Sequence, residues 1–296
     1  MTFRRQIFAL LLLAPGFLLP ASAQEGSDEI GVWSELGIEK SITKSWDVGL
    51  DFEYRAQNRS RFSAGLGTSY KLNRYLKIGV SYSFLYSQRP DKYKEKSEGV
   101  VGAESWTTGY NYTSEYWFPR HRFSAELTGS IKLWKWLKVS LRERYQLTHG
   151  RARNVDKLKH RVANEIKYDF DDDWNEITWY EQEVTDDVVT EIKPAYTDQV
   201  LRSRLKLEFD KKRNPFSPFV SAEFHNSVGR GDHMLLQKIR TAAGISYKFR
   251  KHNEVSLSYI LTFDMYDTEE DETMTLQTVR LHDRMHAINI GYKYSF

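Results

Sequence analysis

The chain closes with Ile288-Asn289-Ile290-Gly291-Tyr292-Lys293-Tyr294-Ser295-Phe296. Apolar and aromatic side chains occupy the even positions of this stretch, and small or polar side chains occupy the odd positions. Successive side chains of a β-strand point to opposite faces, so the alternation predicts a strand with one apolar face and one polar face.

The same alternation recurs through most of the chain. Each run covers about 9–13 residues, which is the length of a strand that crosses a membrane at a tilt. The clearest runs lie at residues 46–54, 62–72, 76–86, 123–133, 137–145, 201–209, 239–249 and 255–263. Many strands of this kind, with an apolar face on each, favour a closed barrel that turns its apolar side to lipid.

Connections of two lengths separate the runs. Short polar turns follow residue 72, residue 133 and residue 249. Long polar segments alternate with them, at about residues 87–118, 148–160, 226–236 and 264–281. Short periplasmic turns and long extracellular loops are typical of bacterial outer-membrane barrels.

The first 23 residues have the pattern of a secretory signal peptide. Arg4 and Arg5 precede an apolar segment at residues 7–19, and Ala21-Ser22-Ala23 then forms an A-x-A cleavage site. We expect cleavage after Ala23 and export of residues 24–296 as a single barrel domain. A final aromatic residue behind an alternating strand, in an exported chain, resembles the signal that the barrel-insertion machinery reads; its residues are Ile290, Tyr292, Tyr294 and Phe296.

Composition excludes several classes of protein. The 296 residues include no cysteine, which excludes disulfides, thiol catalysis and cysteine-based metal sites. Forty-three Lys and Arg nearly balance forty Asp and Glu, whereas nucleic-acid binding requires a clustered basic excess. A mean hydropathy of −0.61 excludes a bundle of transmembrane helices.

We therefore predict an all-β protein, an antiparallel transmembrane β-barrel of about 12 strands, with 10 as the alternative, in the bacterial outer membrane. Thirteen segments qualify as strands if residues 30–40 count, although single-chain bacterial barrels usually have an even number. Residues 160–200 stay ambiguous between a further transmembrane hairpin and a hairpin outside the membrane. A soluble barrel would instead turn its apolar face inward.

Four stretches resemble the domain-of-unknown-function 2490 family. They are Leu141-Arg142-Glu143-Arg144-Tyr145-Gln146, Leu201-Arg202-Ser203-Arg204-Leu205, the strand from Pro218 to Phe224 with Glu223, and the closing residues 291–296. The resemblance implies an exported outer-membrane barrel and covers nearly all of residues 24–296. It carries no activity that could be transferred.

The polar strand faces supply the candidate site. We expect the lumen to be lined by Arg142, Arg144, Arg202, Arg204, Arg240, Glu126, Glu208 and Glu223. Opposite charges on neighbouring strands could pair and fill the interior, because buried charges need partners. Alternatively, the arginines could line a path for anions. The limited interior of ten to twelve strands favours a packed or narrow lumen over an open pore.

These features favour a passive function over an enzymatic one. We expect a narrow or plugged pore, or a structural barrel that binds through its surface, with outer-membrane lipid and lipopolysaccharide as partners. A membrane-embedded lipid hydrolase is the alternative, with His121 and His286 as its histidines, but no serine or acid lies at a matching spacing. The sequence predicts no cofactor and no metal site, and the acidic run at 267–272 lacks the glycine of a calcium loop. The oligomeric state is open.

Overall fold

A computed structural model describes residues 29–99, 105–171, 174, 176–210, 214–229, 234–265 and 284–296. The predicted signal peptide and the acidic run at 267–272 lie outside these residues. The described chain forms two compact units. One consists of the described residues up to Ser87, of Pro119–Gly150 and of those from Thr197 onward, and the other of those in Gln88–Phe118 and Arg151–Tyr196.

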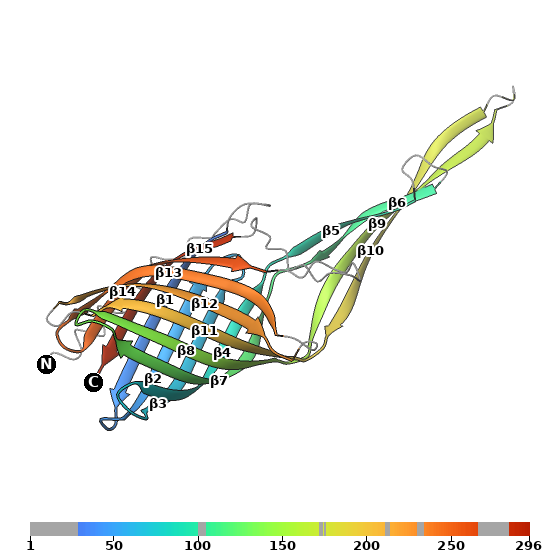
Figure 1. The fold of residues 1–296 in the computed structure, drawn as a ribbon. Coiled ribbons are helices and arrows are strands. Elements are labelled where there is room, and N and C mark those ends of the chain that lie inside the picture. The colour runs from blue at the N-terminus through green and yellow to red at the C-terminus, as the bar shows by residue number, and fades with distance from the viewer. Residues whose placement is uncertain are drawn as a thin grey trace, which may run out of the picture. The chain divides into compact units, whose positions relative to one another are not determined.

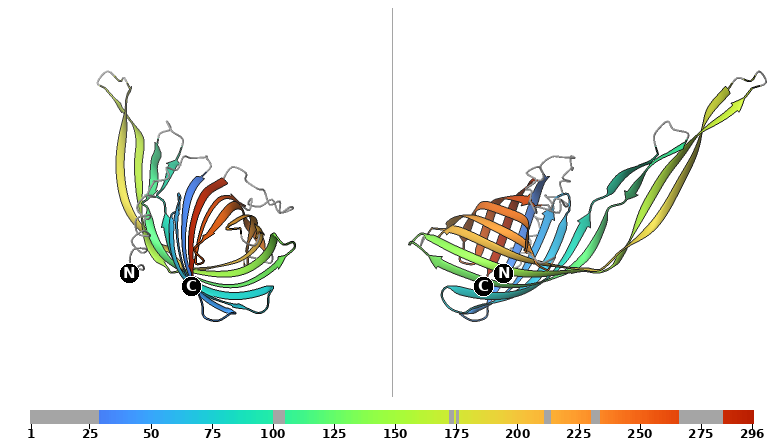
Figure 2. Two further views of the ribbon diagram at one scale, coloured as in Figure 1. Left: turned by 90° about the vertical axis from the view of Figure 1, so that its left-hand side faces the viewer. Right: turned by 45° about the vertical axis from the view of Figure 1, so that its right-hand side comes forward.

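The first unit is built on a closed barrel (Figure 1). Its strands follow the wall order β1-β15-β14-β13-β12-β11-β8-β7-β4-β3-β2, and β2 pairs with β1 again. Their bounds are β1 Glu29–Ser41, β2 Trp46–Ala56, β3 Arg61–Lys71, β4 Leu76–Arg89, β7 Tyr116–Lys132, β8 Leu137–Gly150, β11 Tyr196–Phe209, β12 Phe216–Ser227, β13 Leu235–Phe249, β14 Asn253–Asp264 and β15 Arg284–Ser295. Figure 2 shows these strands running obliquely around the barrel.

The barrel corrects two parts of the predicted fold. The described wall has eleven strands, so it matches neither 12 nor 10, and it is mixed rather than purely antiparallel. An odd wall forces its first and last strands to run in the same direction. The closing pair is accordingly parallel, with Glu29 opposite Met285 and Glu39 opposite Ser295, whereas β14–β15 and β1–β2 are antiparallel.

Residues 160–200 account for the miscount. Most of them lie in β9 (Arg153–Phe170) and β10 (Glu176–Lys193), which pair with each other along their full lengths. These strands belong to a separate four-stranded sheet of order β10-β9-β6-β5 in the second unit. Alternation at period 2 indicates a strand but does not say which strand lies beside it. Removing this hairpin from the thirteen candidates leaves eleven.

The second unit also contains β5 (Lys92–Glu98) and β6 (Ser105–Thr113). Both lie in the segment 87–118 that the sequence suggests is a long polar loop. β6 pairs with β5 on one side and with β9 on the other, and these registers are antiparallel. Lysines and glutamates fill β5, which explains why no apolar period marks it as a strand.

The barrel wall is apolar outside and polar inside. Large outward-facing side chains are well exposed, among them Leu66 at 54%, Leu127 at 46% and Ile288 at 48%. In the described chain only six hydrophobic residues are buried, against fourteen polar or charged ones. A soluble barrel has the opposite arrangement, with an apolar interior and a polar surface. The period-2 pattern therefore predicts the two faces correctly.

Aromatic side chains gather at the barrel end that carries most of the short turns. This end has the connections 42–45, 72–75, 133–136, 210–215 and 250–252. Neighbouring rings there pack together: Trp134 and Trp136 have centroids 5.5 Å apart, and Phe216 and Tyr247 have centroids 4.8 Å apart. Tyr294 and Phe296 form a similar pair at 5.7 Å.

Candidate functional site: the charged lumen

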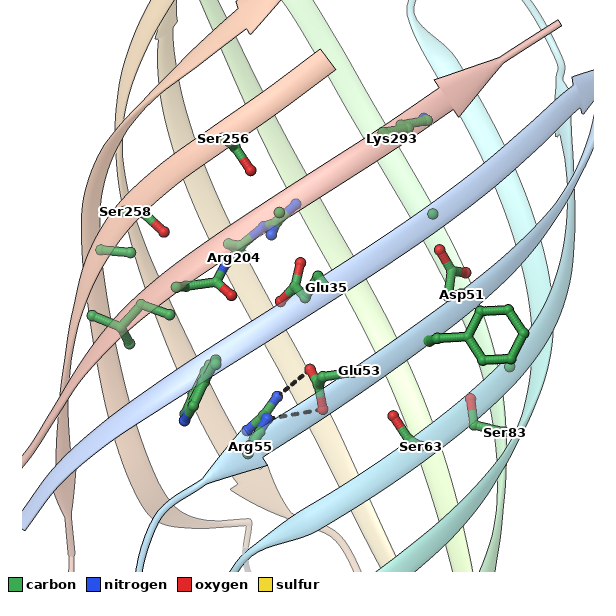
Figure 3. A pocket seen from close by; sticks show the side chains of 18 of the residues that line it. Glu35, Asp51, Glu53, Arg55, Ser63, Ser83, Arg204, Ser256, Ser258 and Lys293 are labelled. Carbon is green, nitrogen blue, oxygen red and sulfur yellow. Dashed lines mark hydrogen bonds and ion pairs between the residues drawn. The ribbon is translucent and has the colours of Figure 1, made fainter. Parts of the chain in front are cut away.

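The barrel encloses a cavity of about 550 Å³. Eight serines supply hydroxyl groups to its lining, and basic groups outnumber acidic ones. Among the described residues, its charged lining consists of Arg55, Arg61, Arg122, Arg142, Arg144, Arg202, Arg204, Arg240, Lys206 and Lys293 against Glu35, Asp51, Glu53, Glu223 and Glu254. Figure 3 shows acidic groups on β1 and β2 with Arg204 reaching into the same space.

Glu223 on β12 is the centre of the largest ion-pair cluster. Its side chain is only 4% exposed, and its Oε2 atom accepts a 3.0 Å hydrogen bond from Arg142 Nη2. Its Oε1 atom accepts hydrogen bonds from Arg202 Nη2 and, at 3.0 Å, from Arg202 Nε. His225 Nε2 lies 2.7 Å away and Arg240 Nη1 3.9 Å away. One carboxylate is thus the shared counterion of several guanidinium groups, and we call this set the Glu223 cluster.

The strand registers explain how the Glu223 cluster forms. Glu223 stands directly opposite Arg204 on β11 and opposite Arg240 on β13. Directly opposite residues of a sheet have side chains on the same face, so the lumen-facing positions of three adjacent strands meet here. Arg142 reaches the cluster from β8, on the far side of β11 in the wall order.

Two further carboxylates, Glu53 and Glu126, also form ion pairs with arginines on the lumen face of the wall. Glu53 on β2 accepts from Arg55 at 2.7 Å and from Arg61 at 2.5 Å. Glu126 on β7 stands opposite Arg144 on β8 and accepts its Nη2 hydrogen at 2.6 Å. Buried ions are stable only when they are paired and hydrogen-bonded. Glu53 and Glu126 provide such pairs for the arginines that they bind.

Trp33 is a fully buried aromatic group inside the lumen. It is 2% exposed, and its ring lies between two cations, with the Arg55 guanidinium carbon 3.7 Å and that of Arg240 4.9 Å from its centroid. Its Nε1 donates a 2.9 Å hydrogen bond to Gln57 Oε1. Ile260 and Ala287 are buried beside it. Cation–π contacts of this kind are strongest when desolvated.

Several of these contacts join strands that are not neighbours in the wall. Trp33 stands on β1 and Arg240 on β13, and β15 and β14 separate these strands in the wall. Arg142 and Glu223 are likewise separated by β11. A continuous series of contacts therefore runs from β8 through β12, β13 and β1 to Arg55 on β2. It forms a constriction made of side chains.

The structure places the predicted lumen residues as follows. Arg142, Arg144, Arg202, Arg204, Arg240 and Glu223 line the cavity. Glu126 and Glu208 are not part of the cavity lining. They form ion pairs with two residues that are, Glu126 with Arg144 and Glu208 with Lys206 at 2.9 Å.

Sequence reasoning misses further lumen residues, among them Trp33, Arg61 and Arg122. Arg61 and Arg122 each come directly before the first apolar residue of a run, which places them on the polar face. Trp33 shares its face with Gly31, Glu35 and Gly37, and a tryptophan among such small and charged residues is the signal that it points into the lumen.

In the described part of the chain, the outer wall carries one acidic residue within its apolar face. Glu143 on β8 lies between Leu141 and Tyr145, which are 51% and 38% exposed, and its Oε2 accepts a 2.6 Å hydrogen bond from Ser203 Oγ. Glu143 lies between Arg142 and Arg144, and Ser203 lies between Arg202 and Arg204. Because successive side chains of a strand point to opposite faces, these four arginines point into the lumen, whereas Glu143 and Ser203 meet on the outer wall.

The two candidate hydrolase histidines lie on the outer wall next to tyrosines. The Nδ1 atom of His121 is hydrogen-bonded to Tyr82 Oη at 2.7 Å, and that of His286 is hydrogen-bonded to Tyr259 Oη. A hydrolase of the Ser–His type needs a serine hydroxyl on the imidazole instead. Among the residues that the structure describes, no three His, Asp or Glu side chains gather closely enough to hold a metal ion.

A family comparison matches the model described as protein of unknown function (DUF2490) over residues 30–273. The chain belongs to this family. The sequence-based resemblance is thereby confirmed. The search among curated proteins found no match for the DUF2490 chain. In the described part of the chain there is no helix long and apolar enough to cross a membrane.

Solved structures similar to this DUF2490 protein include two barrels. The CymD monoaromatic hydrocarbon channel shares 11% identity at a TM-score of 0.35, covering 83% of this chain and 87% of that chain. The translocator domain of autotransporter NalP from Neisseria meningitidis shares 10% identity at a TM-score of 0.28, covering 88% and 90%. These scores are too low to support an inference about function.

Proposed function

We propose that this DUF2490 protein is an integral outer-membrane β-barrel with a narrow, positively charged lumen that passes only small solutes. The observation that carries the proposal is the barrel wall, which is apolar outside and polar inside, the reverse of a soluble barrel. Exposed apolar side chains surround the barrel on strand after strand, and such a surface is stable when it faces lipid. An interior rich in arginine, serine and glutamate is stable when it holds water and ion pairs.

The height of the apolar face supports a membrane location. Phe296, directly after β15, packs against Tyr294 among the aromatic side chains at one end of the barrel, and His286 on β15 bonds Tyr259 near the other end. The ten residue steps from His286 to Phe296 span roughly 33 Å along the strand. At the ~40° tilt of such strands this corresponds to about 25 Å of height, which is the height of the apolar band on outer-membrane barrels.

The orientation follows from the connections. In the proposed membrane, the barrel end that carries the five short turns and the belt of aromatic side chains faces the periplasm, as is usual for these barrels. Phe296 then lies at the periplasmic edge, where Ile290, Tyr292 and Tyr294 would present the insertion signal. The opposite end would contact lipopolysaccharide.

A narrow lumen follows from the constriction. Barrels hold clear aqueous channels nearer 16–18 strands, and this wall has eleven. The Glu223 cluster and Trp33 further divide the interior. We expect water and small ions to pass and larger solutes to be retained.

One purification and one recording test the proposal. We expect the protein to require detergent, to show a heat-dependent shift in gel mobility with β-rich circular dichroism, and to give small, resolvable conductance steps in planar bilayers. Solubility without detergent would contradict the membrane location. If the protein shows the heat-dependent mobility shift but no conductance at any voltage, the pore is contradicted and the barrel is plugged.

Glu143 provides a further test of the lipid-facing wall. A carboxylate on that wall is costly, although less so than the ~2–4 kcal/mol of a cation at the midplane. We expect Glu143→Leu to raise the free energy of unfolding in liposomes by about 1 kcal/mol. Urea titration followed by tryptophan fluorescence measures it. Gln199→Leu, on the same outer face, is the control for added apolar area, and a loss of stability in Glu143→Leu alone would contradict a lipid environment there.

A further inference from the structure

The four-stranded sheet of the second unit has two different faces. Tyr110 on β6 stands opposite His160 on β9, and their rings stack with centroids 4.8 Å apart. Tyr93 on β5 also stacks on Tyr110, at 4.9 Å. Because successive side chains of a strand point to opposite faces, Gly109 and Asn111, which flank Tyr110, belong to the other face.

The other face carries two rows of cations, one on each side of β6. Asn111 has Lys94 directly opposite on β5 and Lys159 directly opposite on β9, and directly opposite residues share a face. Every second residue of a strand returns to that face. The rows consist of Lys92, Lys94 and Lys96 on β5 and of Lys157, Lys159 and Arg161 on β9. We call these six cations the basic patch.

Short side chains separate the two rows. Gly109 lies between Lys96 and Arg161, and an added Cβ there would clash with the carbonyl oxygen of His160, so a larger residue does not fit. Neighbouring strands lie about 4.8 Å apart, and same-face positions follow each other about every 6.8 Å along a strand. The two rows are therefore roughly 10 Å apart, with cations about 7 Å apart within each row.

The basic patch lacks counterions of its own. Among the residues that the structure describes, none of its five lysines has a carboxylate oxygen within ion-pair distance. Arg161 donates hydrogen bonds to the carbonyl oxygens of Tyr110 and His160 and to Asn111 Oδ1, and these acceptors are neutral. The positive charge of the patch is therefore available to an anionic partner.

The carboxylates of this face lie around the basic patch rather than between its rows. They are Glu98 on β5, Glu165 on β9, and Glu181, Glu183, Asp187 and Glu191 on β10. Glu165 and Glu191 bind lysines outside the patch. β10 lies beyond β9 in the sheet order, so its carboxylates are further from β6 than the lysines of β9 are. An anion over β6 is attracted by both rows, since charges act over about 8 Å at physiological salt.

The arrangement of the cations indicates a ligand with several charges along a chain. Two rows of compact ammonium charges suit a polymer that lies between them, whereas a small anion is held by donors that converge on one point. Proteins that bind single-stranded nucleic acid add aromatic side chains on which the bases stack. Here the rings of β5 and β6 lie on the opposite face. The short side chains of Thr107 and Asn111 are polar, as suits the hydroxyl groups of a sugar chain.

We propose that the basic patch binds an acidic polysaccharide, whose carboxylate or sulfate groups lie over β6 between the two rows of cations. The site belongs to the second unit and goes beyond the proposed function of the barrel. It requires neither a conducting lumen nor a membrane location.

Fluorescence anisotropy of labelled polysaccharides, titrated with the detergent-solubilised full-length protein, tests the site. Heparin is the sulfated probe, polygalacturonate the carboxylated probe and dextran the uncharged control. We expect saturable binding of both acidic probes, weakened by salt, and none of dextran. Lys94→Gln and Lys159→Gln should each weaken binding about fivefold, the effect of removing one lysine from an anionic surface. Lys167→Gln is the matched control, because Lys167 shares this face of β9 but is paired with Glu165, and it should leave binding unchanged.

Three outcomes would overturn the inference. Equal loss of affinity in Lys167→Gln would show nonspecific charge attraction, and tighter binding of single-stranded DNA than of the polysaccharides would identify a nucleic-acid site. Lys94→Arg and Lys159→Arg keep the charge and should bind like the unaltered protein, so a loss of affinity there would contradict a site based on charge. Conductance in the same preparation reports on the pore alone.

Discussion

Glu223→Gln is expected to lower the free energy of unfolding by about 3–5 kcal/mol, the usual cost of removing one partner of a buried ion pair. The substitution preserves the shape of the side chain and removes its charge. Arg142, Arg202 and Arg240 then lose their shared counterion in a cavity that already holds a basic excess. Urea unfolding in detergent, followed by circular dichroism, measures the change.

The same variant should alter conduction. With the central carboxylate neutral, the arginines repel one another, and the lumen becomes more strongly anion-selective. Reversal potentials under a salt gradient measure this shift. Glu208→Gln is the matched control because, among the described residues, Glu208 has a single ion-pair partner, Lys206, and we expect a cost of about 0–1 kcal/mol there. Equal effects in both variants would show that the Glu223 cluster has no special role.

Trp33→Ala is the second substitution with a large expected effect. Replacing a buried tryptophan by alanine costs about 3–5 kcal/mol. Here the change also removes the ring between Arg55 and Arg240 and the hydrogen bond to Gln57. The series of contacts across the lumen is interrupted at β1, so we expect larger conductance steps together with lower stability.

A tryptophan on the outer surface separates the effect of position from that of residue type. Trp134 is 58% exposed in the aromatic ring at the short-turn end. Trp134→Ala should leave conductance unchanged and cost much less stability. If Trp33→Ala conducts like the unaltered barrel, the constriction lies elsewhere in the lumen and the proposed role of Trp33 is wrong.

Local alternation makes the two faces of this wall predictable from sequence. Ile288 is 48% exposed and its neighbour Asn289 only 8%, as period 2 requires. The same rule points the arginines on either side of Glu143 and Ser203 into the lumen. These predictions succeed because side-chain direction in a strand depends only on position along that strand.

Neighbour relations between strands are not encoded locally. Whether residues 162–184 belong to the wall depends on which strands they pair with. The sequence pattern does not decide this, because the wall strands and the β9–β10 hairpin have the same alternation of apolar and polar residues. The Glu223 cluster depends on the registers of β11, β12 and β13, and these follow from the whole closed sheet. Trp33 reverses the usual alternation, since its large aromatic ring stands on the polar face.

The parallel closure of β1 on β15 gives the protein an unusual sidedness. In a barrel with an even number of strands, both ends of the wall emerge through the same opening. Here Glu29 lies beside Met285 while Glu39 lies beside Ser295, so the wall begins at one opening and finishes at the other. In the proposed orientation, a segment attached before Glu29 would join the barrel on the cell surface, and one attached after Phe296 would join it on the inner side.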